Sequence, residues 1–194
     1  MQLNHSKKRL SEENMKRAQV GDVYAFKTER GYRIIQWGYF IEKRGSFVRV
    51  FPNFYVEIPS DIEAIVSKEC SYIISFAISK FYRKGMLEFL YRAPLDSIPP
   101  FPQYDINYRS YGSEGSFEVC EFVRHQNFEI FDGYPDGRGL PEKYQNLKLI
   151  NGCVDAIWFI YLLTSNFDLH HWESFYPGEN LYNAFLKKYE SVLL

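Results

Sequence analysis

The stretch GDVYAFKTERGYRIIQWGYF, from Gly21 to Phe40, contains the clearest structural signal in the chain. Two runs rich in β-branched and aromatic residues, 23–28 and 32–42, are separated by Glu29-Arg30-Gly31. This pattern predicts a β-hairpin, because glycine readily adopts the positive φ that a tight turn requires. The second run is apolar on both faces, which is typical of a central strand or of a strand that bends over a small barrel core. Gly38 lies within it and predicts a bend or a bulge.

Similar signals continue on the C-terminal side of the hairpin. A second turn, Lys43-Arg44-Gly45, leads to a third β-like run at 46–51, and three strands joined by two short loops form a meander. Four further β-like runs follow, at 71–81, 86–92, 116–124 and 127–131. The first two of these are expected to pair around Arg83-Lys84-Gly85. The proline-rich segment 94–102 and the Tyr-, Ser- and Gly-rich segment 103–116 are predicted loops.

Capping residues and apolar spacing predict four helices, at 11–19, 60–68, 152–165 and 179–193. Ser11 and Ser60 are the expected N-caps of the first two, which are short. The third is apolar around most of its circumference and is expected to be nearly buried. The fourth carries one apolar stripe at four-residue spacing, formed by Leu181, Phe185 and Tyr189.

These elements predict a single α+β domain over residues 1–194. The sheet, at about 22–131, is expected to be antiparallel and strongly curved, with an SH3-like meander near the N-terminus. The C-terminal helices are expected to pack on it. A chain of 194 residues with 46% hydrophobic content can bury a full core. The chain shows no internal repeat or low-complexity linker, so we take 94–102 as a connection within the domain.

Charge is distributed unevenly along the chain. The formal net charge of −1 argues against a nucleic-acid-binding protein, because such proteins carry a basic excess. Residues 1–50 contain 11 Lys or Arg against 5 Asp or Glu, whereas residues 51–194 contain 12 against 19. The two parts either neutralise each other within the fold or leave an acidic surface that meets a basic partner.

Cysteine content and the N-terminal composition indicate a cytoplasmic protein. Cys70, Cys120 and Cys153 are odd in number and widely spaced, which excludes a disulfide framework and fits reduced, buried thiols. The first residues lack the apolar run of a signal peptide. The longest apolar-leaning run, 156–164, is too short to span a bilayer.

Candidate catalytic and metal-binding side chains are few. Asp168-Leu-His170-His171-Trp-Glu173 is the one local cluster of metal-capable residues. Neighbouring residues on a helix diverge by about 100°, so His170 and His171 cannot both face one ion on regular backbone. Asp132 and Asp136 lack the following Glu of a calcium loop. The sequence contains no GxSxG, HExxH or phosphate-binding loop, and we expect no enzyme, no cofactor and no metal site. The alternative is a small hydrolase or metal-dependent enzyme that uses His170 or His171.

Two segments have the composition of a recognition surface. Tyr104–Glu114 combines tyrosine with serine, glycine and asparagine, as binding loops do. Asp132–Arg138 is a dense turn region. The predicted partner-binding residues are Tyr108, Tyr111, Glu114, Asp132, Tyr134, Asp136 and Arg138. The alternative is that both segments pack on the domain and cap the sheet.

The start of the hairpin resembles the N-terminal signature of the immunity protein 26 family of bacterial polymorphic toxin systems. The similar residues are Gly21-Asp22-Val23-Tyr24-Ala25-Phe26 followed by Gly31-Tyr32. In that signature a Gly-Asp pair enters the first strand and a Gly-aromatic pair turns into the second. Three further features are similar: the apolar strand and proline-rich loop at Leu87–Pro102, the β segment ending at Asp132-Gly133, and Leu140-Pro141-Glu142 before a closing helix. The similarity covers about residues 20–165.

This resemblance implies a cytosolic antidote that binds a cognate toxin protein and blocks it by occlusion. It implies no catalytic residues, and we expect neither a nucleic-acid nor a membrane partner. The oligomeric state stays open. A toxin that acts on nucleic acid would present a basic cleft, which an acidic patch of residues 51–194 would fill as a substrate mimic.

Overall fold

The computed structural model describes residues 18–42, 45–102, 104–110, 117–124, 129–134, 149–153, 156–165, 167 and 179–193. Between 104 and 153 it describes the path and pairing of the strands. Ala18 and Gln19 are not helical, and the rest of the predicted helix at 11–19 lies outside the described residues. That the chain forms one domain stays a prediction.

The described part of the chain contains nine strands and four α-helices. The strands are β1 (Asp22–Thr28), β2 (Gly31–Ile41), β3 (Gly45–Tyr55), β4 (Tyr72–Ser75), β5 (Leu87–Arg92), β6 (Tyr104–Ser110), β7 (Phe117–Arg124), β8 (Glu129–Tyr134) and β9 (Leu149–Cys153). The helices are α2 (Ile62–Val66), α3 (Ile78–Arg83), α4 (Ala156–Thr164) and α5 (Glu179–Leu193), with one 3₁₀ turn, η1 (Leu95–Ser97). The α+β class is therefore confirmed.

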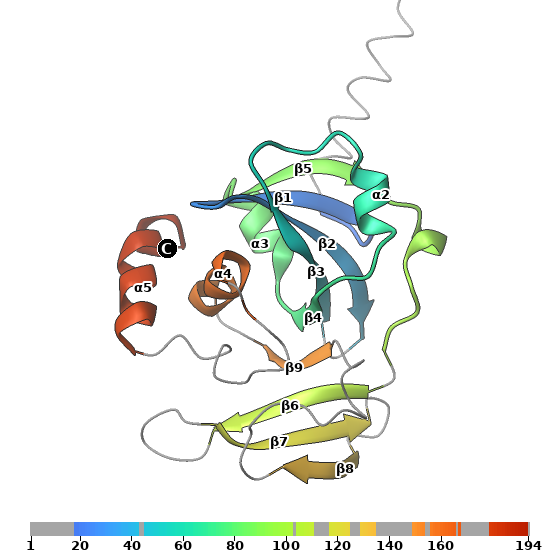
Figure 1. Ribbon diagram of the computed structural model, residues 1–194, viewed down its shortest axis with the longest axis vertical. Helices are drawn as coiled ribbons and strands as arrows, with labels where there is room; N and C mark the ends of the chain where they lie inside the picture. Colours follow the sequence, from blue (N-terminus) through green and yellow to red (C-terminus); the bar gives the residue numbers. More distant parts are fainter. Residues whose placement is uncertain are drawn as a thin grey trace, which may run out of the picture.

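The strands lie side by side in the order β5-β1-β2-β3-β4-β9-β6-β7-β8 (Figure 1). The first five are antiparallel neighbours, and the predicted meander β1-β2-β3 is confirmed. β9 then pairs in parallel with both β4 and β6, which corrects the expectation of a wholly antiparallel sheet. β6, β7 and β8 form an antiparallel unit at the end of the order.

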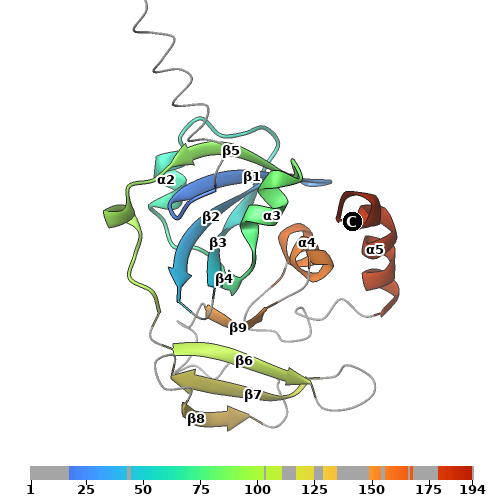
Figure 2. The ribbon, with the colours of Figure 1, turned by 180° about the vertical axis from the view of Figure 1, so that it is seen from behind.

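The expectation of a strongly curved sheet is wrong. The sheet is not strongly curled, and β5 and β8 end the strand order without meeting. The physical reason is that separate layers cover both faces. One core cluster packs the sheet against α3 and α4, and a second packs the opposite face against α2 and the segment after β5 (Figures 1 and 2). The apolar residues are buried without the sheet closing on itself.

The aromatic hairpin supplies residues to both clusters, so β2 is a central strand. Its neighbouring residues Ile34 and Ile35 are both fully buried but belong to opposite clusters. Tyr24 and Phe26 of β1 belong to the cluster beneath α3 and α4. The pairing of β2 with β3 shifts register between Trp37 and Tyr39, which confirms the predicted bulge at Gly38. Three of the six rings of the hairpin are therefore core residues (Tyr24, Phe26 and Tyr39), two are partly buried against the core (Tyr32 and Trp37), and Phe40 is exposed.

The predicted strand pair at 71–81 and 86–92 is not formed. β4 ends at Ser75, and α3 follows, because Ile78 and Phe81 lie three residues apart and bury side by side against the core on a helix. β5 then pairs with β1 instead of β4. Both predicted strands thus exist in shortened form, but their partners were predicted wrongly.

Three smaller boundaries also differ from the expectation. The segment 103–116 contains strand β6 in place of a continuous loop, because β7 and β9 flank it and satisfy its backbone. The helix expected at 60–68 is shorter, and Asp61 rather than Ser60 caps it, with Oδ1 accepting from the Ala64 N–H at 3.0 Å. The helix expected at 152–165 begins at Ala156, since Gly152 and Cys153 belong to β9. The helix at 179–193 is confirmed.

None of the helices in the described part of the chain combines the length and the apolar character needed to cross a membrane. α5 is the longest of them, with 15 residues, and its exposed face carries lysines.

Candidate functional site

The seven residues of the predicted recognition surface divide into two groups. Tyr108 lies in β6, and Asp132 and Tyr134 lie in β8. Asp132 and Tyr134 therefore belong to a strand, which corrects their assignment to turns. The other four lie outside the described residues: Tyr111, Glu114, Asp136 and Arg138.

Strand register brings the two predicted segments onto adjacent strands. Tyr108 is opposite Cys120 of β7, which in turn is opposite Tyr134 of β8. Asp132 of β8 is opposite Phe122, which lies two residues after Cys120 along β7. Because neighbouring strands lie about 4.8 Å apart, the backbones at Tyr108 and Tyr134 are separated by roughly 10 Å. The β6–β8 unit thus unites parts of the candidate surface that are far apart in the sequence.

The residues of the alternative enzymatic site are not among those described. His5, His125, His170 and His171 all lie outside the described ranges, as does Asp168. Within those ranges, no three His, Cys, Asp or Glu side chains come together in a way that could hold a metal ion. Cys70 is buried and is not part of a disulfide, as expected.

Asp22 organises the junction of β1 and β5. Its side chain is 2% exposed and accepts from Arg92, with Nε 2.5 Å from Oδ1. The Tyr24 hydroxyl and the Gln19 N–H donate to Oδ2 at 2.9 and 2.8 Å. Burial, and then the charge of Asp22, raise the pKa of Tyr24 far above its usual range, and the bond to Asp22 raises the pKa of Arg92. The Asp of the resemblance signature therefore has an architectural role.

The two signature glycines are required by backbone geometry. Gly21 has φ +98°, and a Cβ there would lie 2.6 Å from the Ala93 carbonyl oxygen. Gly31 has φ +109°, and a Cβ there would lie 2.2 Å from the Tyr55 carbonyl oxygen. Any side chain would collide with backbone at both positions, on top of the strain of a positive φ.

Arg33 joins the sheet to the C-terminal end of α4. Its side chain is buried, and Nη1 donates to the carbonyls of Leu162, Leu163 and Ser165 at 3.4, 3.3 and 3.1 Å. Nε donates to the Phe51 carbonyl at 3.1 Å. A cation suits this position because the last carbonyls of a helix carry partial negative charge. Burial lowers the pKa of the Arg33 guanidinium.

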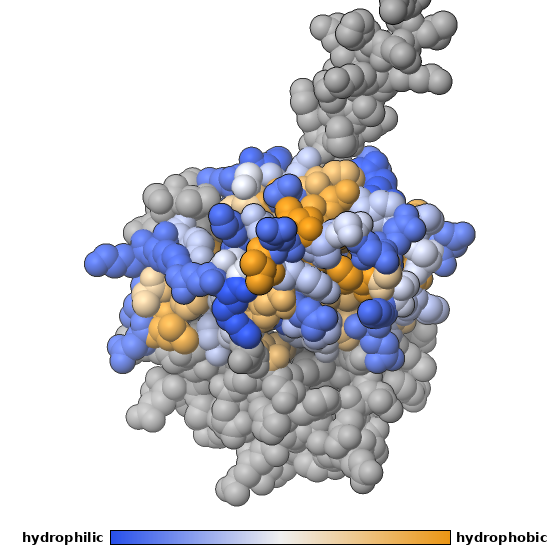
Figure 3. Space-filling view, turned by 45° about the horizontal axis from the view of Figure 1, so that its top comes forward, coloured by the Kyte–Doolittle hydropathy of each residue, from blue (hydrophilic) through white to orange (hydrophobic). Residues whose placement is uncertain are grey.

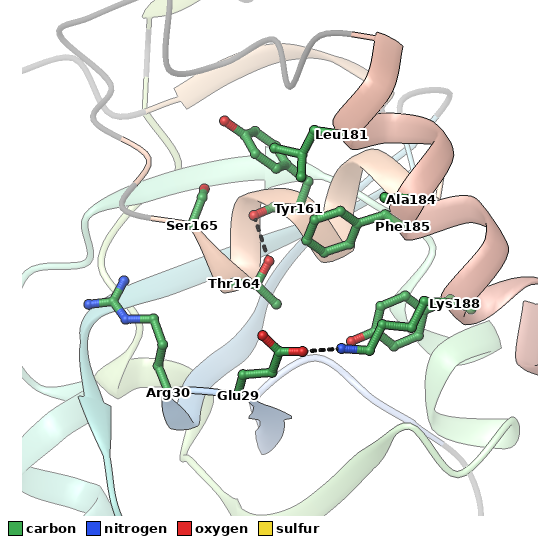
Figure 4. A pocket seen from close by; sticks show the side chains of 10 residues that line it. Glu29, Arg30, Tyr161, Thr164, Ser165, Leu181, Ala184, Phe185 and Lys188 are labelled. Atoms are coloured by element: carbon green, nitrogen blue, oxygen red, sulfur yellow. Dashed lines mark hydrogen bonds and ion pairs between the residues drawn. The ribbon is translucent and has the colours of Figure 1, made fainter.

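A pocket of about 380 Å³ lies between the β1–β2 turn, the end of α4 and helix α5 (Figure 4). We name it the hairpin–helix pocket. The turn contributes Glu29 and Arg30, and the helices contribute Tyr161 and Lys188 among others. Lys188 Nζ lies 2.5 Å from Glu29 Oε1, so an ion pair links the turn to α5. That pair lowers the pKa of Glu29 and raises the pKa of Lys188.

Aromatic rings form the inner wall of this pocket. Tyr161 and Phe185 meet edge to face with centroids 6.1 Å apart, and Phe185 stacks on Tyr189 at the same distance. Burial raises the pKa of Tyr161, against a smaller opposing influence of the nearby Ser165 hydroxyl. That hydroxyl oxygen is itself buried, and it has no hydrogen-bond partner among the residues that the structure describes. The wall is therefore rich in aromatic rings, with the hydroxyl side chains of Thr164 and Ser165 beside them.

The sequence indicated only one side of the hairpin–helix pocket. The stripe of Leu181, Phe185 and Tyr189 was recognised as the packing face of α5, and all three line the pocket. Leu181 remains 43% exposed, so the core does not cover the whole apolar stripe. Nothing in the sequence indicated that Glu29 lines the pocket, because its position there depends on how the hairpin and α5 pack against each other.

A second hollow, of about 430 Å³, lies beside the proline-rich segment. Phe40, Pro99 and Phe101 line it together with Leu95, and Phe40 and Leu95 are 62% and 67% exposed. On the face that Figure 3 shows, hydrophobic residues form small groups interrupted by hydrophilic ones.

Comparison with known proteins adds no relative: the chain matches no family model, and no curated protein or solved structure is significantly similar to it.

Proposed function

We propose that this protein is a cytoplasmic immunity protein that binds a cognate bacterial toxin and neutralises it by occluding it. The observation that carries the proposal is the Gly21-Asp22 and Gly31-Tyr32 signature. Its glycines occupy backbone positions that admit no side chain, and Asp22 ties β1 to β5. A signature of this kind marks an architecture rather than a catalytic centre, which agrees with a family that acts by binding. We also propose, from the spacing of its strands and turns, that the β1–β2–β3 meander is SH3-like.

We place the toxin-binding surface on the β6–β8 unit and the segments that flank it. Two features support this placement. The register of β6, β7 and β8 places Tyr108, Asp132 and Tyr134 on one three-stranded unit, with β7 between Tyr108 and the other two. Residues 51–194, which include this unit, carry 12 basic against 19 acidic side chains. An acidic partner surface would accelerate association with a basic toxin cleft, most strongly at low salt.

The direct test is co-expression with the toxin encoded next to this protein, followed by co-purification and a growth assay. We expect rescue of growth and a stable complex. Tyr108→Ala and Asp132→Asn are expected to weaken the complex by about 2 kcal/mol each if these residues are binding hot spots. Asp96→Asn is the matched control, because Asp96 is exposed and lies in η1. Absence of both rescue and complex formation would refute the proposal.

The enzymatic alternative is tested in the same assay. A variant carrying His170→Ala and His171→Ala removes the side chains on which that alternative depends. An immunity protein that acts by occlusion is expected to keep its protective effect in this variant. Loss of protection with the complex still intact would favour the enzyme.

A further inference from the structure

The hairpin–helix pocket has the size and the wall of a small-molecule site. Its volume of about 380 Å³ lies within the range of ligand pockets, roughly 300–1,000 Å³. The rings of Tyr161, Phe185 and Tyr189 supply a wall against which a planar aromatic group can stack or pack edge-on. The pocket is thus shaped for an aromatic body.

The charges around the pocket select for an anion. Arg30 and Lys188 both line it, and the guanidinium of Arg33 lies just behind its wall, 3.1 Å from the Ser165 carbonyl oxygen. Among the lining residues the one carboxylate is that of Glu29. Among the described residues that line the pocket, two cations against one carboxylate leave a net positive charge, which attracts a negatively charged ligand.

Glu29 marks the position that a ligand carboxylate would take. Its side chain is 84% exposed and reaches from a two-residue turn to meet Lys188 across the opening (Figure 4). An exposed ion pair of this kind contributes little free energy, because water competes for both partners. A ligand carboxylate can therefore displace Glu29 from Lys188 at small cost.

We propose that the hairpin–helix pocket binds a small aromatic carboxylate, with its ring against Phe185 and Tyr161 and its carboxylate on Lys188 in place of Glu29. This site is separate from the β6–β8 unit and does not depend on the immunity function. Its test uses the purified protein without any toxin, so the two proposals fail independently.

The experiment is calorimetric titration with 1-naphthaleneacetate, and in parallel with its neutral analogue 1-naphthaleneacetamide. For a ligand of this size we expect a dissociation constant of about 1 mM for the acid. The amide is expected to bind roughly fivefold more weakly, since it cannot form the ion pair with Lys188. Equal affinity for acid and amide would overturn the proposal, as would absence of binding by the acid.

Three variants locate the site. Lys188→Met is expected to weaken binding of the acid roughly fivefold, and Glu29→Gln to strengthen it by a similar factor because the resident carboxylate no longer competes. Lys187→Met is the matched control: it makes the same change at the neighbouring exposed position of α5 and is expected to leave affinity unchanged. Circular dichroism establishes that each variant is folded. An equal loss in Lys187→Met and Lys188→Met, or a weaker acid complex in Glu29→Gln, would contradict the proposed site.

Discussion

Arg92 holds Asp22 through two contacts across neighbouring strands: Nε lies 2.5 Å from Oδ1, and Nη2 lies 3.3 Å from Oδ2. Asp22 is the first residue of β1 and Arg92 the last of β5, and the two are register partners. The ion pair therefore fastens the edge strand to the sheet at the point where the chain leaves β5 for the proline-rich segment.

Asp22→Asn is expected to lower the free energy of unfolding by roughly 2 kcal/mol, because it leaves the partly buried Arg92 without its carboxylate. Urea denaturation measures this change. Asp61→Asn is the control, since Asp61 caps α2 at an exposed site and asparagine is an equally good cap. Equal unfolding midpoints for Asp22→Asn and the unchanged protein would show that the pair contributes nothing.

Gly21→Ala is expected to destabilise the protein far more than Gly45→Ala. Both glycines have a positive φ, but a Cβ at Gly21 would lie 2.6 Å from the Ala93 carbonyl oxygen, whereas at Gly45 it would meet nothing within 4 Å. Backbone strain alone costs about 1–2 kcal/mol, and the collision at Gly21 adds to it. Thermal unfolding of the two variants separates strain from collision. Similar melting temperatures would mean that β1 and the Ala93 segment move apart freely.

Arg33→Met is expected to lower the free energy of unfolding by about 3 kcal/mol. The substitution keeps an apolar stem but leaves the buried Leu163 carbonyl and the partly buried Ser165 carbonyl without this donor. Arg33→Lys is expected to restore only part of the loss, since one ammonium cannot match the spread of guanidinium donors. Arg83→Met serves as the control, because Arg83 is exposed and its Nε donates to Ser79 at 3.4 Å. A full rescue by lysine would show that charge alone is required.

Stability is expected to fall as pH rises above 10. Burial raises the pKa of Tyr72 to about 12, while the unfolded chain keeps the ordinary value of 10. The unfolded state thus loses its proton first, so the stability contributed by the neutral buried phenol is complete below pH 10 and is lost between pH 10 and 12. The slope for one such tyrosine is at most about 1.4 kcal/mol per pH unit.

Tyr72→Phe isolates this contribution. The variant loses the hydrogen bond from the Tyr72 hydroxyl to the Leu162 carbonyl, 2.9 Å long, and is expected to be about 1 kcal/mol less stable at pH 7. Between pH 10 and 12 its stability is expected to decline less steeply than that of the unchanged protein. Parallel pH profiles for the two proteins would contradict the assignment.

Only part of the candidate site was predictable. The segments containing Tyr108 and Tyr134 were selected from composition, but nothing in their sequence showed that β7 would lie between them. The hairpin–helix pocket was even less predictable, since Glu29 and Lys188 form an ion pair although they are 159 residues apart in the sequence. Contacts of this kind follow from how elements dock, and no local pattern encodes them.

Local sequence patterns were sufficient to predict several elements, although not α3 or β6. Glycine turns and β-branched runs specified the β1–β2–β3 meander, the two-faced apolar pattern specified β2 as central, and four-residue apolar spacing specified α5. Tertiary structure alone decided which strands pair beyond the meander. β5 joins β1, and β9 enters between β4 and β6, because strand partners are selected by which arrangement buries apolar residues on both faces and satisfies the backbone. Local propensity cannot distinguish between such partners, since every strand offers the same donors and acceptors.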